Sequence, residues 1–272
     1  MSEIIQVSDE WLAVREPEDA RARSRDLALA AAAMLPAGPI VVHDLGSGTG
    51  SMMRWLAPLL PGPQTWVLHD WSPSLTERAI DGPRPVDQDN EPIDVSAQVG
   101  QLADLQASDL QGASLVTASA LLDVLTSREV HAIVDACVAS GCPALLTLSV
   151  TGFVELNPFD ERDDAFRRAF NAHQLRITDG RRLLGRYGAL VARGLFTEAG
   201  WHVRSSVTTW RLNDAEPRLL REWLDGWIGA AVEQSPELQD EAVRYREWRV
   251  AQQGRGELSA IIRHVDLLAC PR

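Results

Sequence analysis

Three glycines and an acid form the part of this sequence that is best suited to bind a ligand. Residues 41–51 read VVHDLGSGTGS, so that Gly46, Gly48 and Gly50 follow Asp44 at every second position. Glycine lets a ligand approach the backbone, because it has no Cβ and adopts positive φ at no steric cost. A dinucleotide-binding loop has the spacing G-x-G-x-x-G, whereas here the third glycine comes one residue early. Together with the carboxylate, this spacing predicts a site for a cationic ligand without phosphates.

Composition and charge exclude several classes of protein. The sequence contains no lysine, so all 26 basic residues are arginine. A P-loop NTPase and an enzyme with a lysine Schiff base are therefore excluded. The net charge of -12 disfavours nucleic acid as a partner, because phosphate binding requires a basic surface. We find no apolar run long enough to span a membrane and no secretory signal, and we expect a cytoplasmic protein that does not bind membranes.

The elements that must position the glycine loop alternate between strand and helix. Short, apolar, β-branched runs predict buried strands at residues 39–45, 64–70, 93–100, within 113–125, and at 143–150. Helical patterns lie between them and also over residues 8–35. This alternation predicts an α/β fold with a doubly wound, mostly parallel sheet. In such a sheet, ligands bind at the carboxyl ends of the central strands, where the glycine loop stands.

The second half of the chain adds helices to this sheet. Residues 158–199 and 214–253 have charged, helical patterns. Strands are expected at 200–212 and 258–270, which brings the total to seven. We expect a single domain, because both helical stretches fit insertions over one edge of one sheet.

The run D-L-G-S-G-T-G resembles the first motif of the class I S-adenosylmethionine-dependent methyltransferases. Asp70 ends the second strand, 20 residues after Gly50, where this family has an acid on the ribose diol. Trp71 follows, where the family often stacks an apolar side chain on adenine. After the third strand the family usually has an acid near the adenine amine, but this chain has Gln101, with Asp104 three residues later. The resemblance implies S-adenosylmethionine as the cofactor and methyl transfer as the reaction.

The same resemblance implies a set of cofactor contacts. Ser119 lies in TASALLD after the fourth strand, where the family lines the methyl channel. Arg23 lies in N-terminal helices that often cover the cofactor in this fold, and it could pair with the cofactor carboxylate. The full set is Asp44, Gly46, Ser47, Gly48, Gly50, Asp70, Trp71, Gln101, Leu102, Ser119 and Arg23.

The resemblance also implies how one Rossmann-like domain over residues 1–272 is divided. An N-terminal helical lid covers residues 1–37, and the cofactor-binding core covers 38–150. Helical insertions at 151–199, after the fifth strand, and at 213–256, before the last strand, are expected to form the acceptor site.

A looser resemblance concerns the acceptor. Runs such as WLAVREPEDARARS and WLDGWIGAAVEQSPEL resemble actinobacterial sugar O-methyltransferases, some of which methylate mannosides of mycobacterial methylmannose polysaccharides. This implies a hydroxyl of a sugar or oligosaccharide as the acceptor. A small carboxylate or amine metabolite is an alternative, and Arg176, Arg181 or Arg182 could bind a carboxylate. A non-catalytic S-adenosylmethionine-binding module is a second alternative, and a homodimer is left open.

A hydroxyl acceptor calls for a base or a metal, because a neutral hydroxyl is a poor nucleophile. We expect His173, in the insertion after the fifth strand, to be the general base. Asp123 and Glu155 are further catalytic candidates. Glu155 could instead hold a divalent ion such as Mg²⁺ together with Asp160, and Glu233 could reach the acceptor.

Overall fold

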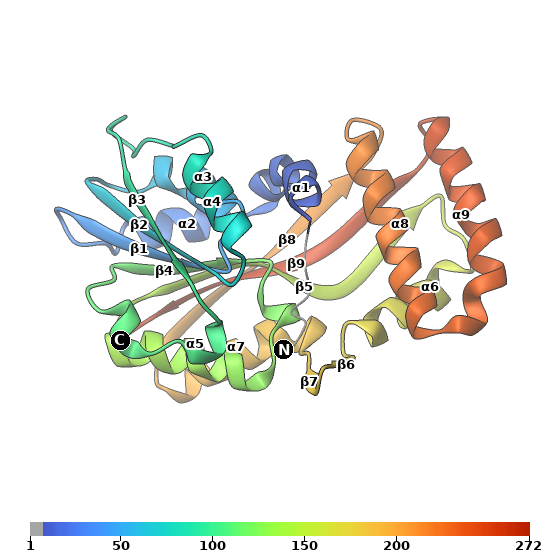
Figure 1. Cartoon of the computed structure of the whole chain (residues 1–272). Helices are drawn as coiled ribbons and strands as arrows, with labels where there is room; N and C mark the ends of the chain where they lie inside the picture. Colours follow the sequence, from blue (N-terminus) through green and yellow to red (C-terminus); the bar gives the residue numbers. More distant parts are fainter. Residues whose placement is uncertain (1–7) are drawn as a thin grey trace.

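Seven strands form one mixed sheet in the computed structural model, which describes residues 8–272. Their order is β3-β2-β1-β4-β5-β9-β8 (Figure 1). The parallel part consists of β1 (Ile40–Leu45), β2 (Gln64–Asp70), β3 (Asp94–Val99), β4 (Leu115–Ser119) and β5 (Ala144–Asn157). β9 (Ser259–Cys270) is antiparallel to both β5 and β8 (His202–Leu212). The predicted doubly wound, mostly parallel, seven-stranded sheet is therefore confirmed.

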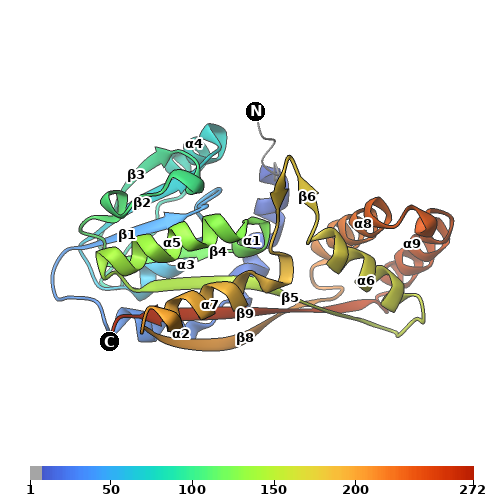
Figure 2. The same ribbon diagram turned by 90° about the horizontal axis from the view of Figure 1, so that it is seen from below.

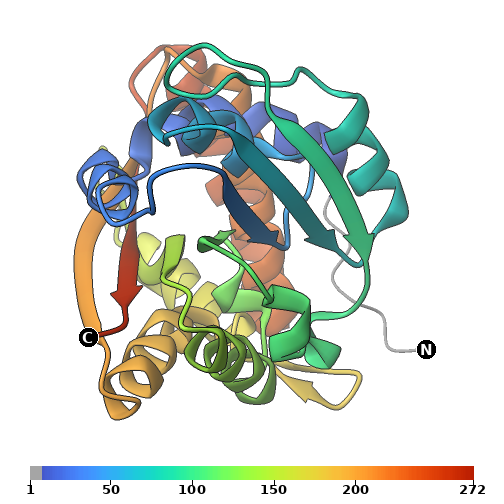
Figure 3. The ribbon, with the colours of Figure 1, turned by 90° about the vertical axis from the view of Figure 1, so that its left-hand side faces the viewer.

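Helices cover both faces of this sheet (Figures 2 and 3). α5 (Ser127–Ser140) and α7 (Gly188–Glu198) pack on one face, through residues such as Ile133 and Phe196. α2 (Arg25–Ala32), α3 (Ser51–Leu56) and α4 (Pro73–Asp81) pack on the other, through residues such as Met53. Strands that are covered on both sides contact apolar side chains on both sides, which explains why β1 and β4 are continuous apolar runs in the sequence.

β5, β8 and β9 are longer than β1 to β4 and extend well beyond them on one side of the sheet (Figure 1). The sequence predicted that the fifth strand ends at residue 150, but β5 remains paired with β9 as far as Asn157. A register shift between Val150 and Val154 accommodates Gly152, whose φ is +79°. The insertion therefore begins later than the predicted residue 151, and Glu155 belongs to the strand.

A layer of three helices packs against these extended strand ends (Figure 1). It consists of α6 (Asp163–His173), α8 (Pro217–Gln234) and α9 (Gln239–Gly254). Its own hydrophobic core contains Phe166, Trp210, Trp223, Trp227 and Tyr245. No helix in the described range, 8–272, combines the length and apolar character needed to cross a membrane.

The prediction of continuous helix over residues 158–199 was wrong in its middle. A hairpin of β6 (Ile177–Thr178) and β7 (Arg181–Arg182) separates α6 from α7. Asp179 and Gly180 join its strands, with φ of +49° and +76°. Positive φ at both central residues is typical of a type I′ turn, and Asp-Gly is a preferred sequence for it. The Asp-Gly pair was therefore the signal that could have located this hairpin.

Of the two N-terminal helices, α1 lies between the parallel strands and the layer formed by α6, α8 and α9 (Figure 1). α1 (Asp9–Ala22) is capped by Ser8, whose Oγ accepts a hydrogen bond from Trp11 N at 3.2 Å. Arg23 and Ser24 interrupt the helix before α2 begins. This break fixes the direction of the Arg23 side chain, which is described below.

Candidate active site

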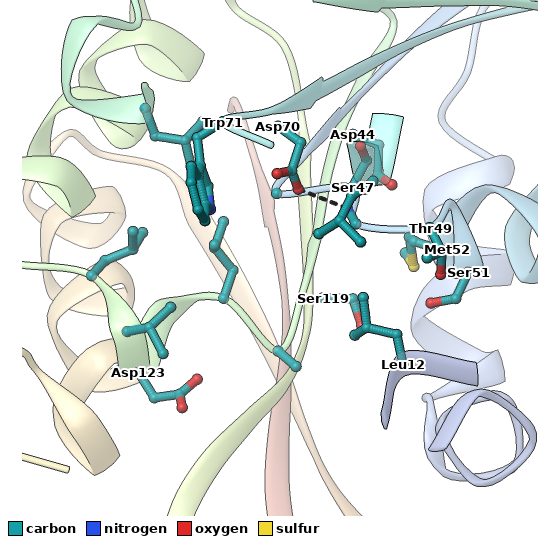
Figure 4. A pocket seen from close by; sticks show the side chains of 18 of the residues that line it. Leu12, Asp44, Ser47, Thr49, Ser51, Met52, Asp70, Trp71, Ser119 and Asp123 are labelled. Atoms are coloured by element: carbon teal, nitrogen blue, oxygen red, sulfur yellow. Dashed lines mark hydrogen bonds between the residues drawn. The ribbon is translucent and has the colours of Figure 1, made fainter. Parts of the chain in front are cut away.

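A pocket of about 340 Å³ lies at the carboxyl ends of the parallel strands, next to α1 (Figure 4). Its lining comes from the loop after β1, the end of β2, the segment after β3, residues 119–125, and one side of α1. Glu129 of α5 and Arg181 of the hairpin complete it. Small-molecule sites have volumes of about 300–1,000 Å³, so the pocket can enclose one small ligand or a cofactor.

The three glycines of the loop after β1 all have positive φ, the conformation that favours glycine. Gly46, Gly48 and Gly50 have φ of +64°, +52° and +82°. A Cβ on Gly46 would lie 2.7 Å from Cδ1 of Leu121, so the end of the Leu121 side chain would have to shift. Glycine is therefore favoured in this loop chiefly for its positive φ, and it presents bare backbone to the pocket.

Asp44, at the end of β1, has one carboxylate oxygen free for a ligand. Its Oδ1 accepts a hydrogen bond from the Thr117 hydroxyl at 2.7 Å, whereas its buried Oδ2 has no partner within residues 8–272. Burial raises the pKa of this carboxyl to about 7. The hydroxyl of Ser47 is likewise buried and unpaired in the described part of the chain. Buried polar atoms are normally paired, so this corner of the pocket is suited to a polar or cationic group.

Asp70, at the end of β2, holds the glycine loop in place. Its Oδ2 accepts from Gly48 N at 2.8 Å and its Oδ1 accepts from Ser72 N at 2.9 Å. Burial raises the pKa of the Asp70 carboxyl. The ring of Trp71 lies next to Asp70 in the pocket and is 37% exposed (Figure 4).

The structure distinguishes the two residues that the sequence offered for the adenine edge. Gln101 and Leu102 line the pocket. Asp104 lines an adjoining smaller pocket of about 210 Å³, together with His69 and Asp109. Gln101 therefore reaches the larger pocket, whereas Asp104 lines only the smaller one.

Arg23 enters the pocket from the break between α1 and α2. It is only 3% exposed, and its guanidinium donates to Oγ of Ser119 at 2.9 Å and to Oγ of Ser51 at 3.0 Å. Burial lowers the pKa of Arg23, and the nearby Asp19 carboxylate opposes this effect. The pocket lining thus includes ten of the eleven predicted cofactor residues, and the eleventh, Gly50, is the N-cap residue of α3.

The half of the pocket away from Asp44 and Asp70 contains Asp123 (Figure 4). Asp123 lies in a 3₁₀ turn, Leu122–Val124, directly after β4. Its Oδ1 is buried and has no partner among the residues described, and burial raises its pKa to about 6. Nη2 of Arg181 donates to both carboxylate oxygens of Glu129 at 2.9 Å. Of the three catalytic candidates, Asp123 alone lines the pocket.

His173 and Glu155 do not reach the pocket. Nε2 of His173 lies 3.1 Å from an oxygen of Glu233, because α6 packs against α8 and not over the pocket. Burial lowers the pKa of His173. Glu155 points to solvent from β5, and Asp160 pairs with Arg162 at 2.6 Å. Within residues 8–272 no group of three or more His, Cys, Asp or Glu side chains is arranged to hold a metal.

Sequence reasoning missed most of the α1 contribution. Trp11, Leu12, Arg15 and Asp19 of α1 line the pocket, and none of them belongs to the predicted set of cofactor contacts. Three of them recur at four-residue spacing and so share one helix face, which is the signal that could have found them. Nε of Arg15 pairs with Asp19 at 2.9 Å, and Nε1 of Trp210 also donates to Asp19.

No family model and no curated protein sequence matches the chain. Among solved structures, a cyclopropane synthase from Mycobacterium tuberculosis is 14% identical, with 97% of this chain and 95% of that chain covered and a TM-score of 0.52. A SAM-dependent methyltransferase from Geobacter sulfurreducens, in complex with S-adenosyl-L-homocysteine, is 18% identical, with coverages of 97% and 99% and a TM-score of 0.43.

An O-methyltransferase family protein from Burkholderia thailandensis is 18% identical, with a TM-score of 0.45. The match covers 73% of this chain and 54% of that one, so this chain spans about half of that protein. At such identities the likeness concerns the fold. This chain has the Rossmann-like methyltransferase fold. The fold is shown by the strand order, by the glycine loop after β1 and by the likeness of the chain to the mycobacterial synthase.

Proposed function

We propose that this chain is an S-adenosylmethionine-dependent methyltransferase that methylates a hydroxyl of a small molecule, with a sugar or oligosaccharide favoured. The observation that carries the proposal is the free, buried Oδ2 of Asp44, unpaired within the described chain, beside a loop of glycines with positive φ. A cationic amino group is the complement of such an oxygen.

The other residues of this half fit the rest of the cofactor. Arg23 is placed to pair with a carboxylate, and it would exchange its serine partners for it. Asp70 and Trp71 are adjacent, as binding of a ribose diol and stacking on adenine would require (Figure 4). The amide of Gln101 can serve the adenine edge in place of the usual acid. These assignments follow the motifs and are supported by the common pocket.

Asp123 is the group best placed to accept the proton of the acceptor. S-adenosylmethionine, when bound, supplies a sulfonium methyl group whose C–S bond breaks with its electron pair going to sulfur. The hydroxyl oxygen of the acceptor forms the new C–O bond with a lone pair, and the Asp123 carboxylate takes the hydroxyl proton. A base with a pKa of about 6 is mostly ionised at pH 7 and still binds a proton well.

Titration calorimetry with S-adenosylhomocysteine and S-adenosylmethionine tests the first step. We expect saturable binding by the wild-type chain and weaker binding by Asp44→Asn. Absence of binding by the folded wild type would refute the proposal at its root. Mass spectrometry of reactions with methyl mannoside, free mannose oligosaccharides and small carboxylates then tests the acceptor.

A carboxylate acceptor is the second candidate, because Arg181 has a buried Nη1 without a partner in the described chain. A carboxylate is already ionised and needs no base. Asp123→Asn should therefore abolish methylation of a hydroxyl but leave methylation of a carboxylate nearly unchanged. The same variant thus separates the two acceptors.

A further inference from the structure

We propose that Arg181 binds a second oxygen of the acceptor, next to the hydroxyl that Asp123 deprotonates, so that the site selects an uncharged vicinal diol over an isolated alcohol. This inference rests on the proposed function and adds the acceptor class to it. It makes the short β6–β7 hairpin the element that determines acceptor specificity.

The hairpin is docked onto the segment that carries Asp123. Leu184 N donates to Leu125 O at 2.9 Å, and Leu183 forms a bridge with Thr126. Nη2 of Arg181 lies 3.4 Å from the carbonyl oxygen of Val124, the residue after Asp123. The guanidinium therefore lies beside the turn that presents the Asp123 carboxylate, and both side chains line the same pocket.

Each of the two side chains has one buried polar atom that remains unpaired within residues 8–272. These are Nη1 of Arg181, which can only donate, and Oδ1 of Asp123, which accepts when ionised. Leaving such atoms unpaired is costly, so a ligand that pairs both is strongly preferred. Two neighbouring oxygens supply that pairing, because one hydroxyl donates to Asp123 while the adjacent oxygen accepts from Arg181.

Charge favours an uncharged acceptor over an anion. Glu129 neutralises Arg181 through two contacts at 2.9 Å, and Asp19 neutralises Arg15 at 2.9 Å. These two ion pairs leave the Asp123 carboxylate as a fifth, unpaired group. It is negatively charged when it acts as a base. An anionic acceptor would face that carboxylate, so Arg181 serves as a hydrogen-bond donor and not as a net positive charge.

Binding to the protein saturated with S-adenosylhomocysteine tests this assignment without relying on turnover. The probes are cis- and trans-cyclohexane-1,2-diol and cyclohexanol, and the measurement is the Kd from titration calorimetry. We expect at least one diol to bind about 10- to 100-fold more tightly than cyclohexanol, as one hydrogen bond to a charged donor provides. Arg181→Gln should remove this preference and leave cyclohexanol binding unchanged.

The control is Arg182→Gln, which alters the exposed neighbour on the same hairpin and should preserve the preference. Equal binding of diol and alcohol by the wild type would overturn the inference, as would failure of all three probes to bind. Equal weakening of all probes in Arg181→Gln would show a purely structural role. Tighter binding of cyclohexanecarboxylate than of the diols would assign Arg181 to a carboxylate instead. If the folded wild type did not bind S-adenosylhomocysteine, this result would refute the proposed function and not this inference alone.

Discussion

Replacing Asp44 with asparagine should make the folded protein more stable while weakening its binding of the cofactor. The carboxyl is completely buried, and desolvation raises its pKa from 3.8 to about 7. Keeping it ionised at pH 8 therefore costs the folded state about 4 kcal/mol, at about 1.4 kcal/mol per pKa unit. In the proposed function, the Oδ2 of Asp44 that lacks a partner among the described residues binds the cationic amino group of the cofactor.

The sign of the effect follows from the raised pKa. A carboxyl whose pKa is higher in the folded state contributes stability that is fully present below pH 3.8 and is lost as the pH rises through 7. Asparagine has no charge at any pH, and its Oδ1 can still accept from Thr117. Its amide nitrogen takes the place of the unpaired oxygen and costs about 1–3 kcal/mol. We therefore expect a net gain of about 1–3 kcal/mol at pH 8, which becomes a net loss of about 1–3 kcal/mol toward pH 4, where the wild-type carboxyl is protonated and only the cost of the asparagine amide remains.

Urea denaturation of the wild type and Asp44→Asn at both pH values measures this difference. Asp135→Asn is the matched control, because Asp135 is an exposed carboxylate on α5 and should show neither effect. Calorimetry at pH 8 should show S-adenosylhomocysteine binding weakened about 10- to 100-fold, the loss of one charge-assisted hydrogen bond. A less stable Asp44→Asn at pH 8, or unchanged cofactor affinity, would refute the reasoning.

Asp123→Asn should lower kcat by about 100- to 10,000-fold and leave the Kd for S-adenosylhomocysteine unchanged. For the wild type, kcat/KM should rise as the pH increases through about 6, where Asp123 ionises. A wild-type rate that does not depend on pH would contradict this role. Gly46→Ala should destabilise the protein by about 1–3 kcal/mol more than Gly112→Ala in thermal denaturation, because both glycines have positive φ but a Cβ on Gly112 would meet no described atom within 4 Å. The buried His43–His69 pair, joined at 2.9 Å, should make the fold sensitive to acid. Burial lowers the pKa of His69 to about 4, so about 3 kcal/mol of stability, present above pH 6.5, is lost as the pH falls toward 4. Denaturation curves of His69→Gln should lack this loss.

Local sequence was sufficient for the parallel part of the fold and for the glycine loop. Continuous apolar runs ending in Asp44 and Asp70 are detectable without tertiary information, because strands buried on both faces leave that pattern. The length of β5 was not detectable in the same way. Whether Val154 and Leu156 extend a strand or begin an insertion depends on pairing with β9, more than a hundred residues away.

The half of the pocket that contains Asp123 depended on tertiary contacts even more strongly. His173 was the favoured base because it follows the fifth strand, but packing of α6 on α8 turns it toward Glu233. Arg181 reaches Glu129 because the hairpin docks on the turn after β4. No periodicity or spacing within either segment encodes that docking.

The sequence by itself thus determined the sheet, the loop of positive-φ glycines and the two acids at strand ends. These features arise from local backbone preference and from burial, which a single segment expresses in its own residues. Only the tertiary structure decided which of the three catalytic candidates lines the pocket and which face of α1 covers it. Those outcomes depend on how distant segments pack together, and among residues 8–272 that packing leaves polar atoms of Asp44, Asp123 and Arg181 unpaired in residues that line the pocket.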